Sequence, residues 1–211
     1  MLMTRSLGDR VFDQIRKEIL AGSLKPGDPL SEREVAIRTK VSRVPVREAL
    51  IRLEAKGLIS LVKDRGGVVR TFGIEDIRHL YEVRENLEGL AARLAAGRIP
   101  PKELQQFEKA LRAFKHSSNS DDIAQLRRVS AQFHETIIAK CGNPLLQRSL
   151  ADLREQVQLS RAFTHSKLSM SDVLHRVQDH LAILRSLRNG DGSKAEKQMR
   201  AHISRWQTIS L

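Results

Sequence analysis

The chain has 211 residues, with 37 Lys and Arg against 25 Asp and Glu. Its net charge of +12 favours a polyanionic partner, although charge alone supports only solubility and non-specific binding. Its single cysteine, Cys141, excludes an intrachain disulfide and agrees with a reducing compartment. No apolar run approaches the roughly 18 residues of a membrane span and no signal-peptide pattern is present, so we expect a cytoplasmic protein without a membrane segment.

The first predicted helix covers residues 7–21. Its apolar residues Val11, Ile15 and Ile19 recur every four positions, which places them on one helix face. Gly22 follows as a glycine that ends the helix. We expect this helix to support the next two helices from behind.

Two short helices joined by a tight turn are predicted within residues 31–53. Ser31 and Glu34 match an S-x-x-E capping box, in which the serine hydroxyl caps the amide three residues on and the glutamate reaches back. Ser42 is placed to cap the second helix, and Pro45 falls in its first turn, where a missing N–H costs nothing. The segment therefore has the pattern of a helix-turn-helix.

The start of the second helix carries two arginines. Arg43 and Arg47 are four residues apart, so they share one face near the helix N-terminus. In a helix-turn-helix this end of the second helix meets base edges in the DNA major groove. An arginine there can bond guanine O6 and N7 at once. An ordinary helical hairpin with a solvated basic face explains the same residues, and the motif alone does not choose between the two.

The residues after the second helix favour the DNA-binding interpretation. Gly57 ends the helix, and residues 58–62 and 68–70 are predicted strands on either side of a turn at 63–67. Three helices followed by a two-stranded wing is the order of a winged helix. The turn carries Arg65 beside two glycines, which permit a close approach to a phosphate backbone.

Three spaced segments within residues 11–70, IRKEILAGSLKPGDPLSEREVA, VSRVPVREALIRLEAKGLI and RGGVV, occur in this order. They resemble the DNA-binding domain of the GntR family of bacterial transcription regulators. The resemblance implies contacts with a double-stranded DNA operator by Arg33, Ser42, Arg43, Arg47 and the wing residue Gly66, and we add Arg65 at the turn. Because a palindromic operator mirrors a twofold dimer, we expect a homodimer.

The second part of the chain contains no predicted strand. Helices are expected over residues 74–98, 101–115, 121–141, 145–163, 171–188 and 193–209. The first of these has its expected apolar face at Ile77, Leu80, Val83, Leu87, Leu90, Ala91 and Leu94. The predicted fold class is mainly α: a winged helix-turn-helix domain over residues 1–72, then an all-α bundle of six to seven helices over residues 73–211.

Three histidines lie within the predicted helices of this bundle. His134, His180 and His202 have apolar neighbours at three- or four-residue spacing, so all three can face one interior. Facing helices of a bundle are where metal sites are built, and neutral imidazole is a common ligand for zinc and nickel. Three unrelated core histidines are the alternative, because the short ligand spacing of a zinc motif is not present.

Four further segments, LYEVRENLEGLAARLAA, FHETIIAKCGNPLL, DHLAILRSLRNGD and MRAHI, resemble the ligand-binding domain of the FadR subfamily, known as the FCD domain. Many members bind a divalent metal through one aspartate and three histidines. The histidines match His134, His180 and His202, but Ser130 stands at the aspartate position. A serine hydroxyl is neutral and a weaker ligand. A Zn or Ni ion would then need its charge balanced by something else, such as a bound organic acid.

Arg84 is the candidate for an effector contact. The resemblance implies that the arginine of the EVR element faces the ligand cavity, and a guanidinium fork suits a carboxylate. The alternative is an intrahelical pair with Glu88 at i+4, and the two interpretations are compatible.

These features together indicate a DNA-binding transcription regulator, and the family resemblance favours a repressor. We expect its operator affinity to be controlled by a small organic acid bound near a divalent metal, and we do not expect an enzyme. One alternative is a regulator that responds to the metal itself. A metal-dependent hydrolase is another, but it lacks an evident general base beside His134, because position 130 is serine and Glu135 points away.

Overall fold

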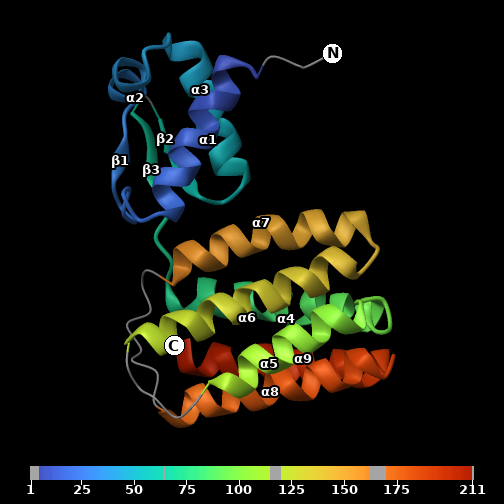
Figure 1. The fold of residues 1–211 in the computed structure, drawn as a ribbon. Coiled ribbons are helices and arrows are strands. Elements are labelled where there is room, and N and C mark those ends of the chain that lie inside the picture. The colour runs from blue at the N-terminus through green and yellow to red at the C-terminus, as the bar shows by residue number, and fades with distance from the viewer. Residues whose placement is uncertain (1–4, 64, 115–119, 162–169, 211) are drawn as a thin grey trace. The chain divides into compact units, whose positions relative to one another are not determined.

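The computed structural model describes residues 5–63, 65–114, 120–161 and 170–210 (Figure 1). The chain divides into two compact units. The first comprises Met1–Ile77 with Arg154–His165, and the second comprises Arg78–Leu153 with Ser166–Leu211. Helices form most of the described chain, which confirms the predicted mainly α class. None of the described helices is long and apolar enough to span a membrane.

The first unit contains the predicted helix-turn-helix and a small sheet. Its elements are α1 (Leu7–Leu20), β1 (Pro29–Leu30), α2 (Glu32–Thr39), α3 (Arg43–Ala55), β2 (Ile59–Val62) and β3 (Gly66–Val69). The predicted apolar face of α1 is buried, and α1 packs against α3. Between α2 and α3, Lys40 adopts a left-handed conformation with φ of 55°, which ends α2 and makes the turn tight.

The small sheet of this unit has one strand more than predicted. Its antiparallel strands follow the order β1-β3-β2, and β1 pairs with β3 at Pro29↔Val68 and Leu30↔Gly67. The predicted two-stranded wing is present as the β2–β3 hairpin, and the strand that the sequence did not predict is β1. A two-residue strand that begins with proline is too short to show the alternating pattern by which strands are recognised.

The two helices of the motif begin with different caps. Ser31 precedes α2, and its hydroxyl accepts a hydrogen bond from the Glu34 N–H at 3.5 Å, which is the serine half of the predicted capping box. Ser42 occupies the corresponding position before α3, but among the described residues its side chain makes no capping bond, contrary to the prediction. Pro45 is the third residue of α3 and has no N–H to donate there. The Ser42 side chain is instead exposed.

The remaining helices of the described chain are α4 (Ile74–Ala95), α5 (Pro101–Ala113), α6 (Ser120–Lys140), α7 (Pro144–Ser160), α8 (Met170–Arg188) and α9 (Gly192–Ser210). They match the six predicted helices with ends shifted by a few residues. Within the second unit, α8 packs against α9 and α5, and Phe133, Ile137 and Ile183 are among the fully buried side chains.

Helix α4 departs from its predicted apolar face. Val83 is 51% exposed, although the spacing placed it inside, whereas Arg84 and Glu88 are buried. These two polar residues are one helical turn apart and bond to each other, so each charge enters the interior with a partner. A hydropathy pattern counts both residues as surface positions and therefore places Val83 inside in error, whereas Ile77, Leu80 and Ala91 are buried as predicted.

Candidate functional site

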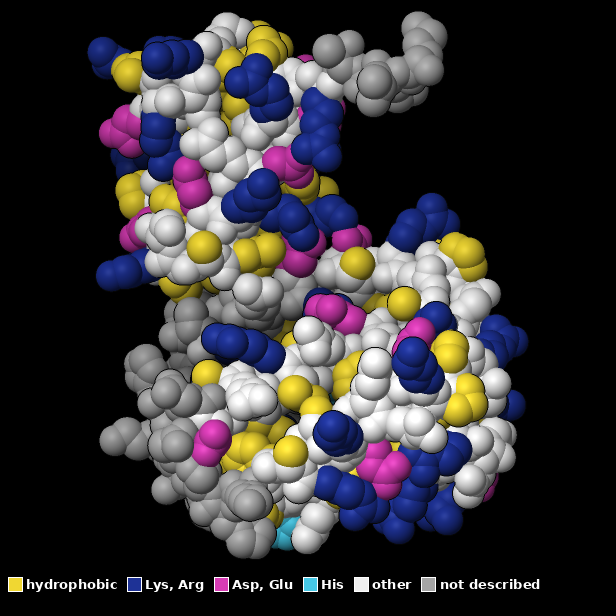
Figure 2. All heavy atoms as spheres, in the orientation of Figure 1, with side chains coloured by type: hydrophobic (Ala, Val, Ile, Leu, Met, Phe, Trp, Pro, Cys, Tyr) yellow, Lys and Arg dark blue, Asp and Glu magenta, His cyan; other side chains and the backbone are white. Residues whose placement is uncertain are grey.

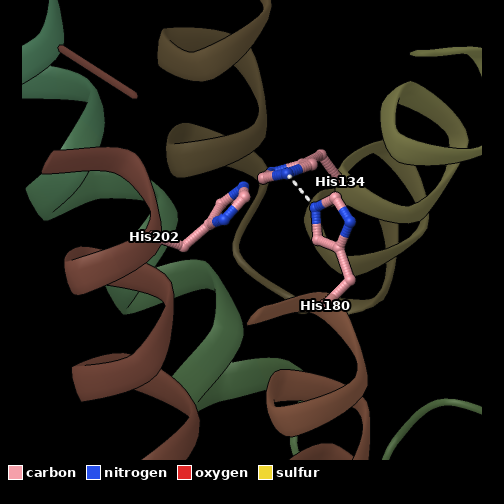
Figure 3. A group of neighbouring side chains, drawn as sticks. All are labelled: His134, His180 and His202. Atoms are coloured by element: carbon pink, nitrogen blue, oxygen red, sulfur yellow. Dashed lines mark hydrogen bonds between the residues drawn. The ribbon is translucent and has the colours of Figure 1, made fainter. Parts of the chain in front are cut away.

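His134 on α6, His180 on α8 and His202 on α9 point toward one another inside the second unit (Figure 3). All three are buried, and one nitrogen of each lies within 4.8 Å of the others. The Nε2 atoms of His134 and His180 are 3.2 Å apart. Two imidazole nitrogens on one tetrahedral zinc ion lie about 3.4 Å apart. The three predicted histidines therefore converge at a spacing that suits one divalent ion.

Two of these rings are supported by carboxylates on their outer nitrogens. The Nδ1 of His134 is hydrogen-bonded to Glu88 of α4, and the Nδ1 of His202 lies 3.2 Å from Asp179 Oδ2 of α8. Histidines that bind metals usually have such a partner, which orients the ring and increases its basicity. His180 differs, because its buried Nδ1 has no hydrogen-bond partner among the described residues. The donor set and most of its support are those of a metal site.

Ser130 completes the surroundings of the triad. It lies one helical turn before His134 on α6, half-buried, with its hydroxyl 3.5 Å from the Nε2 of His180. The groups gathered here are three imidazoles and one hydroxyl, which are neutral donors and acceptors. Such a set fits zinc or nickel through nitrogen, but it offers little to compensate the charge of the ion.

Burial favours the neutral form of two of these rings, His180 and His202. The pKa values of His180 and His202 lie well below the usual range, first because burial disfavours the imidazolium and then because other positive groups, including Arg176, are close. Neutral imidazole is the form that binds a metal ion. The sequence analysis did not single out Arg176. Its spacing of four residues before His180 is the only signal that could have pointed to it.

Arg84 and Glu88 form a buried ion pair beside the triad. The Arg84 Nε donates to Glu88 Oε1 at 2.6 Å, and the two residues are 8% and 2% exposed. Burial alone would lower the pKa of Arg84 and raise that of Glu88, but the opposite charges reverse both shifts. The predicted pair with Glu88 is present, and Arg84 also lies close enough to His202 to lower the pKa of that ring, whereas its contact with an effector stays a prediction. Its guanidinium has five N–H donors and is hydrogen-bonded to both Glu88 and Tyr81.

The residues predicted to contact DNA all lie in the first unit. Arg33, Ser42, Arg43, Arg47 and Arg65 have exposed side chains, and Gly66 is half-buried. The Arg47 side chain is 72% exposed, and its Nε lies 3.5 Å from Glu32 Oε1 of α2. Val44 was not singled out, yet it is 67% exposed at the start of α3. On the face drawn in Figure 2, Lys and Arg cover both units, so total charge does not mark a binding surface.

The first turn of α3 carries a basic residue and no acid, unlike those of α1 and α2. Helices α1 and α2 begin with the acids Asp9, Glu32 and Glu34, which complement the positive end of the helix dipole. Helix α3 begins with Arg43 and has no acid in its first turn. Positive charge there opposes the dipole, but it attracts an anion such as a DNA phosphate. Departures from such a local preference, here the preference for acids at a helix N-terminus, are expected at functional surfaces.

Gly66 has a structural reason to be glycine. Its φ is 94°, and a Cβ atom there would lie 2.3 Å from the Leu30 carbonyl oxygen of β1. Only glycine tolerates both the conformation and the contact. The residue therefore fixes the wing whether or not it touches DNA. Asp64 in the same turn lies outside the described residues.

Two family models match the chain: the bacterial regulatory proteins of the gntR family over residues 7–69, and the FCD domain over residues 79–205. The chain belongs to the GntR family. It is a DNA-binding transcription regulator rather than an enzyme, and its second domain is an FCD domain. Both predicted resemblances are confirmed at this level, whereas membership of the FadR subfamily stays a prediction.

Curated relatives resemble the chain over nearly its whole length. The transcriptional repressor RspR of Escherichia coli is 30% identical over 200 residues, which cover 95% of this chain and 87% of that protein. A D-xylose utilization operon repressor of Paenarthrobacter nicotinovorans is 29% identical, covering 96% and 88%. The galactonate operon repressor of Escherichia coli is 28% identical, covering 92% and 93%.

Solved structures share the fold. McbR/YncC of Escherichia coli has a TM-score of 0.73 at 21% identity, covering 98% of this chain and 97% of that one. A GntR regulator from Rhodococcus sp. RHA1 has a TM-score of 0.72 at 20% identity, covering 97% of both chains. At these identities the likeness shows the fold alone.

Proposed function

We propose that the protein is a repressor that binds a double-stranded DNA operator as a homodimer and releases it when the FCD domain binds a small organic acid beside a divalent metal. The observation that carries the proposal is the convergence of three buried histidines next to the buried Arg84. A bundle interior rarely gathers so many polar side chains without a ligand to bind. The subfamily assignment to FadR belongs to this proposal.

The first domain reads the operator. Each protomer places Arg43 and Arg47 in a major groove, with Arg33 and Ser42 at neighbouring base edges or phosphates. The wing brings Arg65, with Gly66, to the nearby backbone or minor groove. At the start of α3, Val44 exposes two methyl groups that suit the C5-methyl group of thymine. A repressor of this kind acts on the chromosome, and therefore in the bacterial cytoplasm.

The second domain binds the signal. His134, His180 and His202 would hold a zinc or nickel ion, which supplies a Lewis-acidic anchor for an anionic ligand. Arg84 orients a carboxylate through N–H donors that its bond to Glu88 Oε1 does not use. One relative is named for the operon of galactonate, a small carboxylic acid, and another for D-xylose, an uncharged sugar. The carboxylate is therefore supported by Arg84 and by the metal rather than by those names.

A regulator that responds to the metal alone is the second candidate. The carboxylates on the outer nitrogens of His134 and His202 favour it, because they support metal binding by these rings without an organic ligand. In that case operator affinity would follow metal concentration without any acid.

The test begins with operator DNA selected from random duplexes by the tag-free full chain. Metal content is then measured for the wild type, for His134→Ala and for His175→Ala, which alters an exposed histidine on α8. We expect about one divalent ion per chain in the wild type and the control, and none in His134→Ala. Release of the operator by metal together with a carboxylate supports the main proposal. Release by metal alone supports the second candidate, and failure to select any sequence contradicts both.

A further inference from the structure

Among the described residues, the ligand atoms gathered at the histidine centre are imidazole nitrogens, and no carboxylate oxygen joins them. His134, His180 and His202 contribute imidazoles, and Ser130 contributes a hydroxyl 3.5 Å from the Nε2 of His180. A divalent ion held by these donors alone keeps its full charge in a buried, poorly solvated place. An uncompensated buried charge is costly. The centre therefore favours an ion that arrives with an anion.

The two nearby carboxylates are directed to other partners. Glu88 bonds to Arg84 and to the Nδ1 of His134, and Asp179 lies at the Nδ1 of His202. The Nδ1 and Nε2 atoms lie on opposite sides of an imidazole ring. A carboxylate on Nδ1 therefore supports the ring without binding the ion on the other side. Neither acid replaces a direct anionic ligand.

We propose that a divalent metal ion and a carboxylate anion bind this centre with positive linkage, and that Ser130 is the residue that makes metal binding depend on the anion. The inference rests on the metal site in the proposed function. The anion takes the coordination position on the Ser130 side, where it cancels part of the metal charge. Arg84 and Arg176 add positive charge around the same place. Linkage is reciprocal, so the metal raises the affinity for the anion by the same factor.

The linkage determines which combination of ligands the regulator responds to. Neither the metal nor the acid alone fills the centre well, so a response to the acid requires that the metal be available. A carboxylate built into the protein at position 130 would instead hold the ion permanently. The serine therefore makes the centre a detector of the two ligands together.

The test is a titration of Zn²⁺ into the metal-free full chain, with a competing chelator to report affinity. It is run with saturating acetate and with a non-coordinating salt of the same ionic strength. Wild type, Ser130→Asp and Ser130→Ala are compared, after circular dichroism shows equal helix content. The visible spectrum of the Co²⁺ form, which depends on coordination geometry, gives a second readout.

Acetate is expected to tighten Zn²⁺ binding by the wild type roughly tenfold or more and to change its Co²⁺ spectrum. Ser130→Asp should bind Zn²⁺ tightly without acetate and respond little to it, whereas Ser130→Ala should behave as the wild type does. Equal Zn²⁺ affinity of the wild type in both salts would overturn the linkage but leave the proposed metal site intact. Uptake of Zn²⁺ by Ser130→Asp only, under either condition, would overturn both.

Discussion

The proposed DNA-reading surface and the histidine centre are built in opposite ways. On the first, Arg43, Val44 and Arg47 follow one another within two turns of α3, and their side chains are exposed. At the second, His134 and His202 come from helices far apart in sequence and are buried. The surface is a continuous stretch of one helix, whereas the centre exists only when the bundle folds.

This difference determines what stabilises each site. An exposed arginine needs little support, because water solvates it until DNA arrives. A buried histidine or arginine needs partners in place, and the centre provides them as Glu88 and Asp179. A substitution on the surface should therefore change binding without affecting the fold, and one in the centre should change both.

The largest predicted effect is the loss of stability when a buried ion pair of α4 is broken, compared with the loss for an exposed pair at the same four-residue spacing. Glu88→Gln leaves the buried charge of Arg84 unpaired and should lower the free energy of unfolding by about 3–5 kcal/mol. Glu82→Gln removes the exposed pair with Arg78 and should cost about 0.5 kcal/mol or less. Urea unfolding of the metal-free full chain, followed by circular dichroism, measures both. Equal losses in the two variants would show that burial does not distinguish the pairs.

The next effect concerns the surface. Arg47→Ala should weaken binding to the selected operator by roughly 1–3 kcal/mol, as expected for a lost guanine contact, and should leave the unfolding midpoint unchanged. Arg112 is an exposed arginine on α5, and Arg112→Ala is the matched control, which should bind the operator as the wild type does. Fluorescence anisotropy with labelled operator gives both affinities. An unchanged affinity for Arg47→Ala would remove the base-reading role.

The smallest predicted effect concerns the contact between Val44, on the same surface, and a thymine methyl group of the operator. Replacing single thymines of the operator by deoxyuracil removes only a methyl group, so each contact with Val44 should be worth about 0.8 kcal/mol, or about fourfold in affinity. Val44→Ala should lose most of the preference for thymine. If both proteins respond equally to the replacement, another residue contacts the methyl group.

The sequence predicted the helix-turn-helix and its hairpin well because their signals are local. The helix-turn-helix and the wing lie within one segment, and Arg43 and Arg47 can be assigned from spacing alone. Two local details failed. Ser42 makes no side-chain capping bond before α3, where Pro45 removes one of the two N–H groups that a cap can bind, and β1 was too short to recognise.

The centre was only half predictable. His134, His180 and His202 were found from their mid-helix positions and from the family resemblance. Their support was not, because Glu88 and Asp179 have no sequence signal that separates a buried carboxylate from a solvated one. The same limit explains why Val83 was placed inside α4 and Glu88 was treated as a surface partner of Arg84. Burial of a polar pair depends on neighbours distant in sequence.

The most direct test asks whether the buried centre controls the exposed surface. The operator affinity of the full chain is measured without ligands, and again with Zn²⁺ and a carboxylate that the metal titration shows to bind. We predict that the ligands weaken operator binding by the wild type by about 1–3 kcal/mol, or roughly 5–150-fold, and leave His134→Ala unaffected. An unchanged wild-type affinity, with metal and acid demonstrably bound, would contradict control of DNA binding by this centre.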